Sequence, residues 1–251
     1  MAGHSQFANI MHRKGAQDKK KAKKYNKLSR EITVAAKSGQ PDPAANSRLR
    51  NAIDMARKEN MTSDRIKRAV ELANPNNADA SNYEEVRYEG YGPGGVALII
   101  EALTDNRNRT AGDVRLAFTK NDGALGETNS VSFMFSKIGS IVFAASVAGT
   151  DQIFEAAVEA GADNVESSAD VHEVSTKPSD FIAVKEALEK KFGPSQSADI
   201  IWKPNVTVPV TQEQAKDLID LIEALEDYDD VQNVFSNFEV DDSVMARLTA
   251  S

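Results

Sequence analysis

The sequence of 251 residues contains no cysteine, only three histidines and a single tryptophan. The absence of cysteine excludes disulfide bonds, thiolate nucleophiles and thiolate metal sites. The histidines (His4, His12 and His172) are too far apart along the chain to form a zinc site by spacing. With so few histidines, a Ser–His–acid catalytic set is disfavoured. We therefore predict a protein without metal or other cofactor, and not an enzyme.

Long apolar runs are also missing. No stretch approaches the roughly 20 residues that a helix needs to span a bilayer. The first 14 residues lack the continuous apolar core of a secretory signal. The hydrophobic content of 41% and the charged content of 27% are typical of globular domains, and the length allows up to three small ones. We therefore expect a cytoplasmic protein with no membrane segment.

Positive charge is in the minority overall but concentrated near the N-terminus. The formal net charge is −8, yet residues 1–73 hold 17 Lys and Arg against 7 Asp and Glu, a net charge of +10. Residues 13–30 are the densest part, with nine basic residues against Asp18. Such a concentrated positive field attracts polyanions. This stretch therefore predicts binding to DNA or RNA through phosphates, although a lysine run can also be a solvated helix face or a flexible tail.

Eight cations are the predicted nucleic-acid contacts: Arg13, Lys14, Lys19, Lys20, Lys23, Lys24, Lys27 and Arg30. Lys20, Lys24 and Lys27 fall opposite the apolar stripe of a predicted helix, so we expect them to face outward. Tyr25 lies on that stripe and is expected to pack in the core. Arg65, near the start of a later helix, could read a base edge in a helix-turn-helix. That signal is weak, and a packing helix with a solvated face is the favoured interpretation.

Three helices are predicted for the N-terminal region. The first begins near Gln17 and ends at Ser38-Gly39, because glycine readily adopts the left-handed conformation that closes a helix. Asp42-Pro43 is typical of a helix start and predicts a second helix that runs to about Asn60. Thr62 or Ser63 caps a third helix, whose inward side carries Ile66, Ala69 and Val70. The prediction is a basic three-helix domain with an N-terminal arm over residues 1–80.

The remaining chain alternates strands and helices. Strands at 86–91 and 96–103 are joined by the turn Gly92–Gly95, and residues 138–203 spell βαββαβ, the ferredoxin-like plan. A second βαββαβ set is predicted from these ranges: 96–103, 110–121, 130–135, 206–210, a helix capped at Thr211 and Gln214, and 231–240. We predict an α+β fold with domains at 1–80, at 81–137 plus 204–251, and at 138–203, the last inserted into the second. A single continuous mixed sheet is the alternative.

Several strings in this sequence resemble the YebC family. They are MAGHS at the start, ANI followed by HRK, SREI at 29–32, YEGYGPGGV at 88–96 and LTDNRNRT at 103–110. The family includes bacterial proteins named as transcriptional regulators and a mitochondrial translational activator of cytochrome oxidase subunit one. The resemblance implies a helical domain followed by two α/β domains, one inserted into the other. This sequence has Gln6-Phe7 where the family usually has Lys-Trp, which removes one cation and weakens any base stacking there.

The resemblance also implies two activities. One is DNA binding in transcription control, which we place first; the alternative is binding to ribosomal or messenger RNA to relieve stalling on proline-rich sequences. An enzyme that binds a phosphate ligand, with Arg107 and Arg109 as an anion clamp, is less favoured because no phosphate-binding glycine motif accompanies them. Arg107 and Arg109 could instead form a domain-interface pair.

The acidic C-terminal part carries these carboxylates: Glu223, Glu226, Asp227, Asp229, Asp230, Glu239, Asp241 and Asp242. We expect them to keep the protein in solution and to repel nucleic acid, so that only the basic end meets the polyanion. Binding to a basic protein is the alternative. A monomer is the expected state, with nucleic acid as partner.

Overall fold

The computed structural model describes residues 17–74, 76–77 and 82–241, with side chains from Lys21 onward. The chain divides into two compact units, Met1–Met134 with Val206–Ser251, and Phe135–Asn205. Helices come first along the chain and are followed by two four-stranded antiparallel sheets, one in each unit. The predicted α+β class is therefore correct. The predicted separation of residues 1–80 as a domain of their own stays a prediction.

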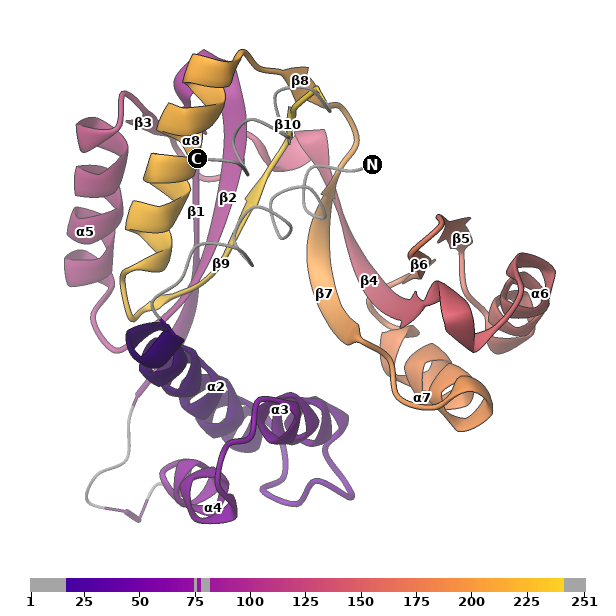
Figure 1. The fold of residues 1–251 in the computed structure, drawn as a ribbon. Coiled ribbons are helices and arrows are strands. Elements are labelled where there is room, and N and C mark those ends of the chain that lie inside the picture. The colour runs from indigo at the N-terminus through magenta and orange to yellow at the C-terminus, as the bar shows by residue number, and fades with distance from the viewer. Residues whose placement is uncertain (1–16, 75, 78–81, 242–251) are drawn as a thin grey trace. The chain divides into compact units, whose positions relative to one another are not determined.

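Three helices form the basic part of the first unit, which we call the head (residues 17–74). They are α2 (Gln17–Ser38), α3 (Ser47–Lys58) and α4 (Ser63–Glu71), and α2 packs against both others (Figure 1). Their shared core includes Leu28, Ile32, Leu49, Ile53 and Ile66. Tyr25 packs against this core, and its hydroxyl donates to the backbone carbonyls that end α3, which confirms its predicted place.

The start of α3 differs from the prediction. Asp42 accepts the backbone N–H of Ala44 in a short turn, and the helix begins only after Asn46. The Asn46 side chain accepts the N–H of Leu49 at 3.0 Å and donates to the carbonyls of Ala35 and Gln40. A buried amide with three hydrogen bonds is a stronger cap than an exposed aspartate, because it also satisfies the end of α2.

The rest of the first unit, which we call the body (residues 82–134 and 206–241), is a sheet covered on one face by two helices. Its strand order is β3-β1-β2-β9, and α5 and α8 lie side by side against it (Figure 1). The elements are β1 (Glu84–Gly92), β2 (Val96–Thr104), α5 (Arg107–Lys120), β3 (Ala124–Leu125), α8 (Gln212–Glu226) and β9 (Val231–Ser236). The strands β8 (Val208–Pro209) and β10 (Phe238–Glu239) form a separate parallel pair. Leu98, Phe118, Leu218 and Phe235 are fully buried here.

Two predicted features of the body are confirmed. Thr211 and Gln214 form the capping box that opens α8, with both reciprocal hydrogen bonds present. Gly94 and Gly95 have φ values of 72° and 73°, in the left-handed region, within the short 3-10 turn Pro93–Gly95 between β1 and β2. These glycines serve the turn, because residues with a side chain rarely adopt that conformation.

Three other predictions for the body are wrong. Residues 130–134 of the strand predicted at 130–135 are not in a strand, because the buried carboxylate of Glu89 accepts the N–H groups of Val131 and Ser132, both at 2.9 Å, so these amides pair with a side chain. The last strand is interrupted at Asn237, whose side chain accepts the N–H of Ala97. The helix predicted over 110–121 begins three residues earlier, at Arg107, because Asn106 caps it.

The second unit has the element order βαββαβ and the antiparallel strand order β5-β6-β4-β7. Its elements are β4 (Phe135–Ala144), α6 (Thr150–Ala160), β5 (Asn164–Ser167), β6 (Val171–Thr176), α7 (Phe181–Phe192) and β7 (Ser197–Pro204). The strand β4 begins three residues before the predicted domain boundary at residue 138, and it pairs with β7 from Phe135 onward. Ile141, Phe143, Ile153, Val174 and Leu188 form part of its core.

The buried His172 of this unit has a partner on each ring nitrogen. Its Nε2 lies 3.0 Å from the carbonyl oxygen of Ala148, and its Nδ1 lies 2.7 Å from the hydroxyl of Ser167. A carbonyl can only accept, so Nε2 donates and Nδ1 accepts from the serine in the neutral ring. None of the helices within the described ranges is long and apolar enough to cross a membrane.

Candidate nucleic-acid interface

Four of the eight predicted contact cations have described side chains: Lys23, Lys24, Lys27 and Arg30 of α2. The others are Arg13 and Lys14, which lie outside the described residues together with Gln6-Phe7, and Lys19 and Lys20, whose backbone belongs to α2 but whose side chains are outside the description. The interface is therefore built from residue 21 onward.

One side of α2 faces the body, near the turn between α8 and β9 (Figure 1). The Nζ of Lys23 lies 2.7 Å from Oδ1 of Asp227 and 3.1 Å from the carbonyl oxygen of the same residue. The Nη1 of Arg30 lies 2.7 Å from Oδ1 of Asp230 and also donates to the carbonyl of Asp229. These cations do lie opposite the bundle core, but acidic groups of the body cover that side.

Lys27 occupies the middle of this contact and is half-buried. Burial lowers the pKa of Lys27 below its ordinary value, and Glu226 acts in the opposite direction. The prediction that Lys27 faces outward into solvent is therefore wrong. A helical wheel distinguishes the core side of a helix from its other side, but it does not show whether a second domain packs on that other side.

Asp230 is a buried residue of the body that contacts the head. Its Oδ1 accepts from Arg30, while its Oδ2 accepts from Arg109 at 2.7 Å, from the hydroxyl of Thr110 at 2.8 Å and from that of Thr104 at 3.2 Å. Its side chain is only 7% exposed. Burial opposes ionisation, but the hydrogen bonds from Arg109 and Thr110 and the charge of Arg30 outweigh it, so the pKa of Asp230 lies below its ordinary value.

The role of Asp230 was missed in the sequence, where the run Asp227-Tyr-Asp-Asp230 indicates only an acidic surface. For Asp230 that interpretation is wrong, because this carboxylate is buried and shared by two arginines. Asp227 and Asp229 are exposed, yet both also contact head cations. The only signal available was the proximity of an acidic run to a helix end, and that pattern is common at ordinary solvated surfaces.

Arg109 and Arg107 occupy different environments at the start of α5. Arg109 is paired with Asp105 at 2.8 Å as well as with Asp230, and these partners raise the pKa of its guanidinium above the ordinary value. Arg107 is exposed and lies 3.7 Å from Glu84. Of the two roles considered for this pair, the contacts of Arg109 favour joining parts of the first unit, because it shares Asp230 with Arg30.

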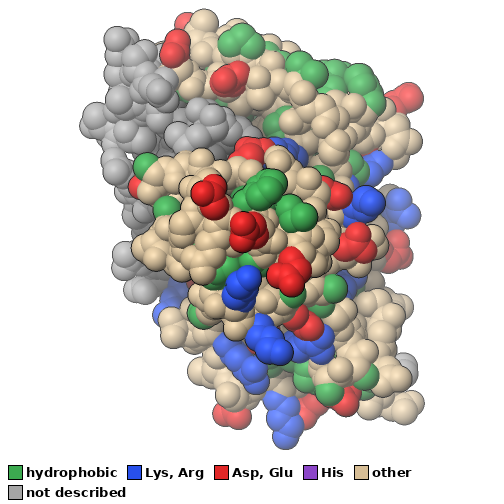
Figure 2. Space-filling view, turned by 90° about the vertical axis from the view of Figure 1, so that its right-hand side faces the viewer, with side chains coloured by type: hydrophobic (Ala, Val, Ile, Leu, Met, Phe, Trp, Pro, Cys, Tyr) green, Lys and Arg blue, Asp and Glu red, His purple; other side chains and the backbone are tan. Residues whose placement is uncertain are grey.

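The outer side of the head carries exposed cations. They include Lys21, Lys24, Arg57, Lys58, Lys67 and Arg68. Lys24 pairs with Glu59 at 2.8 Å, and Lys67 lies 3.9 Å from Glu71; such exposed ion pairs contribute little and exchange readily with other anions. On the face of the molecule drawn in Figure 2, Lys and Arg side chains are interspersed with Asp and Glu.

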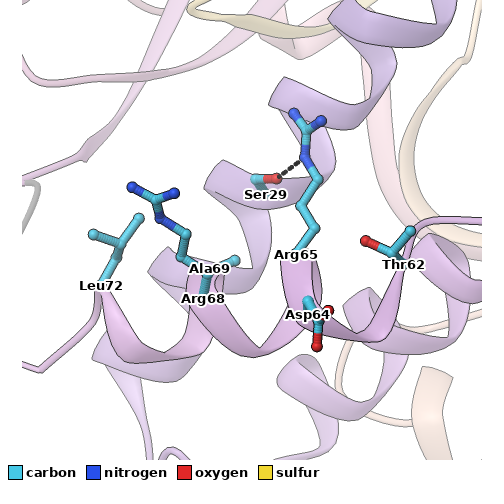
Figure 3. A pocket seen from close by; sticks show the side chains of 7 residues that line it. All are labelled: Ser29, Thr62, Asp64, Arg65, Arg68, Ala69 and Leu72. Atoms are coloured by element: carbon cyan, nitrogen blue, oxygen red, sulfur yellow. Dashed lines mark hydrogen bonds between the residues drawn. The ribbon is translucent and has the colours of Figure 1, made fainter.

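An open pocket of about 510 Å³ lies between α2 and α4. Ser29, Thr62, Asp64, Arg65, Arg68, Ala69 and Leu72 line it (Figure 3). Arg65 points toward α2, donates to Ser29 and to Asn26 at 2.8 Å, and stacks over the Tyr25 ring at 5.3 Å, whereas Arg68 points away from Ser29 (Figure 3). These bonds support the favoured interpretation of α4 as a packing helix, because the base-reading candidate is tied to its own bundle.

Among the residues that the structure describes, no group of three or more His, Asp or Glu side chains is arranged to hold a metal ion. The exposed cations of the head are ammonium and guanidinium groups. These groups donate hydrogen bonds to phosphate oxygens and neutralise their charge.

Comparisons with known proteins agree with this architecture. Residues 5–75 match the model of the TACO1/YebC protein N-terminal domain, and residues 83–238 match that of the TACO1/YebC second and third domain. The crystal structure of a conserved hypothetical protein from Aquifex aeolicus is 43% identical in sequence, with a TM-score of 0.81 over 90% of this chain and 93% of that chain. The chain belongs to the TACO1/YebC family.

Proposed function

We propose that this protein is a non-enzymatic, nucleic-acid-binding regulator of gene expression, and that it binds through the outer side of the head. The observation that carries the proposal is the set of exposed cations on α2, α3 and α4, in a segment of net charge +10 within a protein of net charge −8. Phosphate neutralisation with counterion release supplies the affinity, and it carries little sequence information. DNA is the first candidate ligand, in accordance with transcriptional control.

Ribosomal or messenger RNA is the second candidate, and the position of Arg65 favours it. The guanidinium that could read a base edge is hydrogen-bonded to α2, so the described part of the head offers phosphate contacts more readily than major-groove recognition. Recognition by charge and shape suits structured RNA as well as duplex DNA.

The proposal that the protein is not an enzyme rests mainly on its composition. The chain has no cysteine and three histidines, of which His172 is buried between Ser167 and Ala148. The turn between β1 and β2 accounts for Gly94 and Gly95, so they need no role in phosphate binding. Arg109 already pairs with two carboxylates. A nucleotide turned over by the pure protein, with activity lost on changing Arg107, would revive the enzyme alternative.

The test is binding of a fluorescent DNA duplex and a fluorescent RNA hairpin, followed by anisotropy over a range of salt concentrations. In the test variant, Lys21, Lys24 and Arg68 are all changed to Gln. In the matched control, Arg115, Lys120 and Lys216, exposed cations of the body, are changed to Gln. For duplex DNA the slope of log affinity against log salt should fall by about 0.9 for each phosphate that the test variant no longer neutralises, and by less in the control.

Two outcomes would contradict the proposal: no binding by the wild type at low salt, or equal losses of affinity in the test and control variants. Sedimentation of cell extract through sucrose gradients at low and high salt then separates the two ligands. Salt-sensitive migration with ribosomes is expected for the RNA candidate, and absence from ribosomes with retention on DNA for the other.

A further inference from the structure

Acidic residues of the body pair with head cations that would otherwise be available to bind nucleic acid. Lys23 and Arg30 are paired with the segment Asp227–Asp230, which we call the acidic segment, and Lys27 is half-buried beside it. These residues belong to the densest run of positive charge in the chain. Phosphate cannot reach the inner side of α2 while the acidic segment occupies it.

The acidic segment presents to α2 the kind of groups that a nucleic-acid backbone would present. Lys23 donates to a carboxylate oxygen and to the carbonyl oxygen of Asp227. Arg30 donates to the carboxylate of Asp230 and to the carbonyl of Asp229. Charge-assisted bonds of 2.7 Å from ammonium and guanidinium to anionic oxygen are equally typical of phosphate contacts. The two anions therefore compete for the same donors.

We propose that the acidic segment is an autoinhibitory contact: it occupies the inner cations of α2, and a polyphosphate displaces it when the head binds. This inference rests on the proposed function, since it concerns the regulation of the same basic surface. Nucleic acid first meets the exposed outer cations. Full contact with α2 then requires the ion pairs between head and body to open. The apparent affinity for nucleic acid therefore equals the affinity of the open form multiplied by the fraction of molecules that are open.

The contact is graded in strength along α2. At the Lys23 end both partners are exposed, with 39% of the lysine and 77% of the aspartate side chain accessible, and such pairs are weak and screened by salt. At the Arg30 end the partners are 18% and 7% exposed, and Arg109 and Thr110 hold the same carboxylate. Opening therefore begins at Lys23 and reaches the Arg30–Asp230 pair last.

The test compares two double variants that change the net charge by the same amount. Asp227→Asn with Asp229→Asn removes the exposed charges of the acidic segment and leaves Asp230 intact. Asp217→Asn with Asp220→Asn removes two exposed carboxylates of α8 outside the acidic segment. For the duplex and the hairpin, the first variant should bind about fivefold more tightly than the second, since it loses the exposed ion pair Lys23–Asp227 and the charge of Asp229, which acts on Lys27.

A second measurement follows the displacement itself. The chain has no cysteine, so spin labels can be placed uniquely at Gln40→Cys in the head and Lys216→Cys in the body. The inter-label distance should lengthen or broaden when the duplex or the hairpin is added in excess. Displacement by either ligand supports the proposal.

The possible failures are distinguishable. If both double variants bind with equal affinity, or if the label distance is unchanged at saturating ligand, the proposed function stands and the acidic segment is a permanent structural contact. If neither the wild type nor any variant binds duplex or hairpin, the proposed function fails, and this proposal fails with it.

Discussion

The ion pairs Lys23–Asp227 and Arg30–Asp230 join the same helix to the same acidic segment at the same 2.7 Å distance, yet they differ in their surroundings. Asp227 is 77% exposed and pairs with Lys23, whereas the Asp230 side chain is 7% exposed and accepts from two arginines and two threonines. The environment of an ion pair, more than the distance between its atoms, therefore decides what the pair contributes to stability. We expect the buried pair to anchor the head and the exposed pair to respond to salt and ligands.

The largest expected effect comes from deleting the shared carboxylate. Asp230→Ala should lower the free energy of unfolding by about 3 kcal/mol, because it leaves Arg30 and Arg109 without the buried carboxylate that they share. Urea denaturation followed by circular dichroism measures the change. The control is Asp229→Ala, which removes the adjacent, exposed carboxylate of the same segment and for which a change within about 0.5 kcal/mol is expected. Equal destabilisation of the two variants would show that Asp230 is not the anchor.

An intermediate effect is expected from pH. The pKa of Asp230 is lower in the folded protein than its ordinary value of 3.8 in the unfolded chain. Its contribution to stability is therefore fully present above about pH 4 and is lost as the pH falls through the folded pKa. Glu89 and Glu189 also have lowered pKa values, so the wild type alone does not isolate Asp230.

The difference in stability between the wild type and Asp230→Asn does isolate the contribution of the Asp230 carboxylate. In unfolding experiments from pH 7 down to pH 2, the stability advantage of the wild type over this variant should shrink as the pH falls below 4. The effect should be smaller than that of Asp230→Ala, because the amide retains an acceptor oxygen. An advantage that stays constant across this range would mean that Asp230 does not titrate as proposed.

The smallest effect is expected at the exposed pair. Lys23→Gln should change the free energy of unfolding by less than about 0.5 kcal/mol at low salt, and by less still near 1 M salt, where screening removes most of the attraction. Thermal unfolding at the two salt concentrations measures this. A salt-independent destabilisation as large as that of Asp230→Ala would remove the distinction between the two pairs.

Local patterns predicted most of the helices. The stripe of Tyr25, Leu28 and Ile32 indicated α2, and the capping box at Thr211 indicated the start of α8, since these signals depend on residues a few positions apart. The start of α3 was misplaced because Asn46 caps it with help from carbonyls at the end of α2. A cap that depends on a residue 11 positions earlier cannot be read from its own segment.

The strands were harder to predict where buried side chains replace backbone pairing. Residues 130–135 have the composition of a strand, but the carboxylate of Glu89 takes two of their N–H groups. Asn237 interrupts the last strand in the same way, with its side chain on Ala97. In each case the competing partner is at least 40 residues away in the sequence, so no window of local pattern contains it.

The sequence by itself determined the basic head, the lack of thiol chemistry, the α+β class and the cations that face away from the core of α2. These follow from composition and from periodicities that act within a few residues. Only the tertiary structure decided which of those cations meet solvent and which meet the acidic segment. Arg30 and Asp230 are 200 residues apart in the chain, and their pairing depends on packing the body against one side of a helix whose sequence would suit solvent equally well.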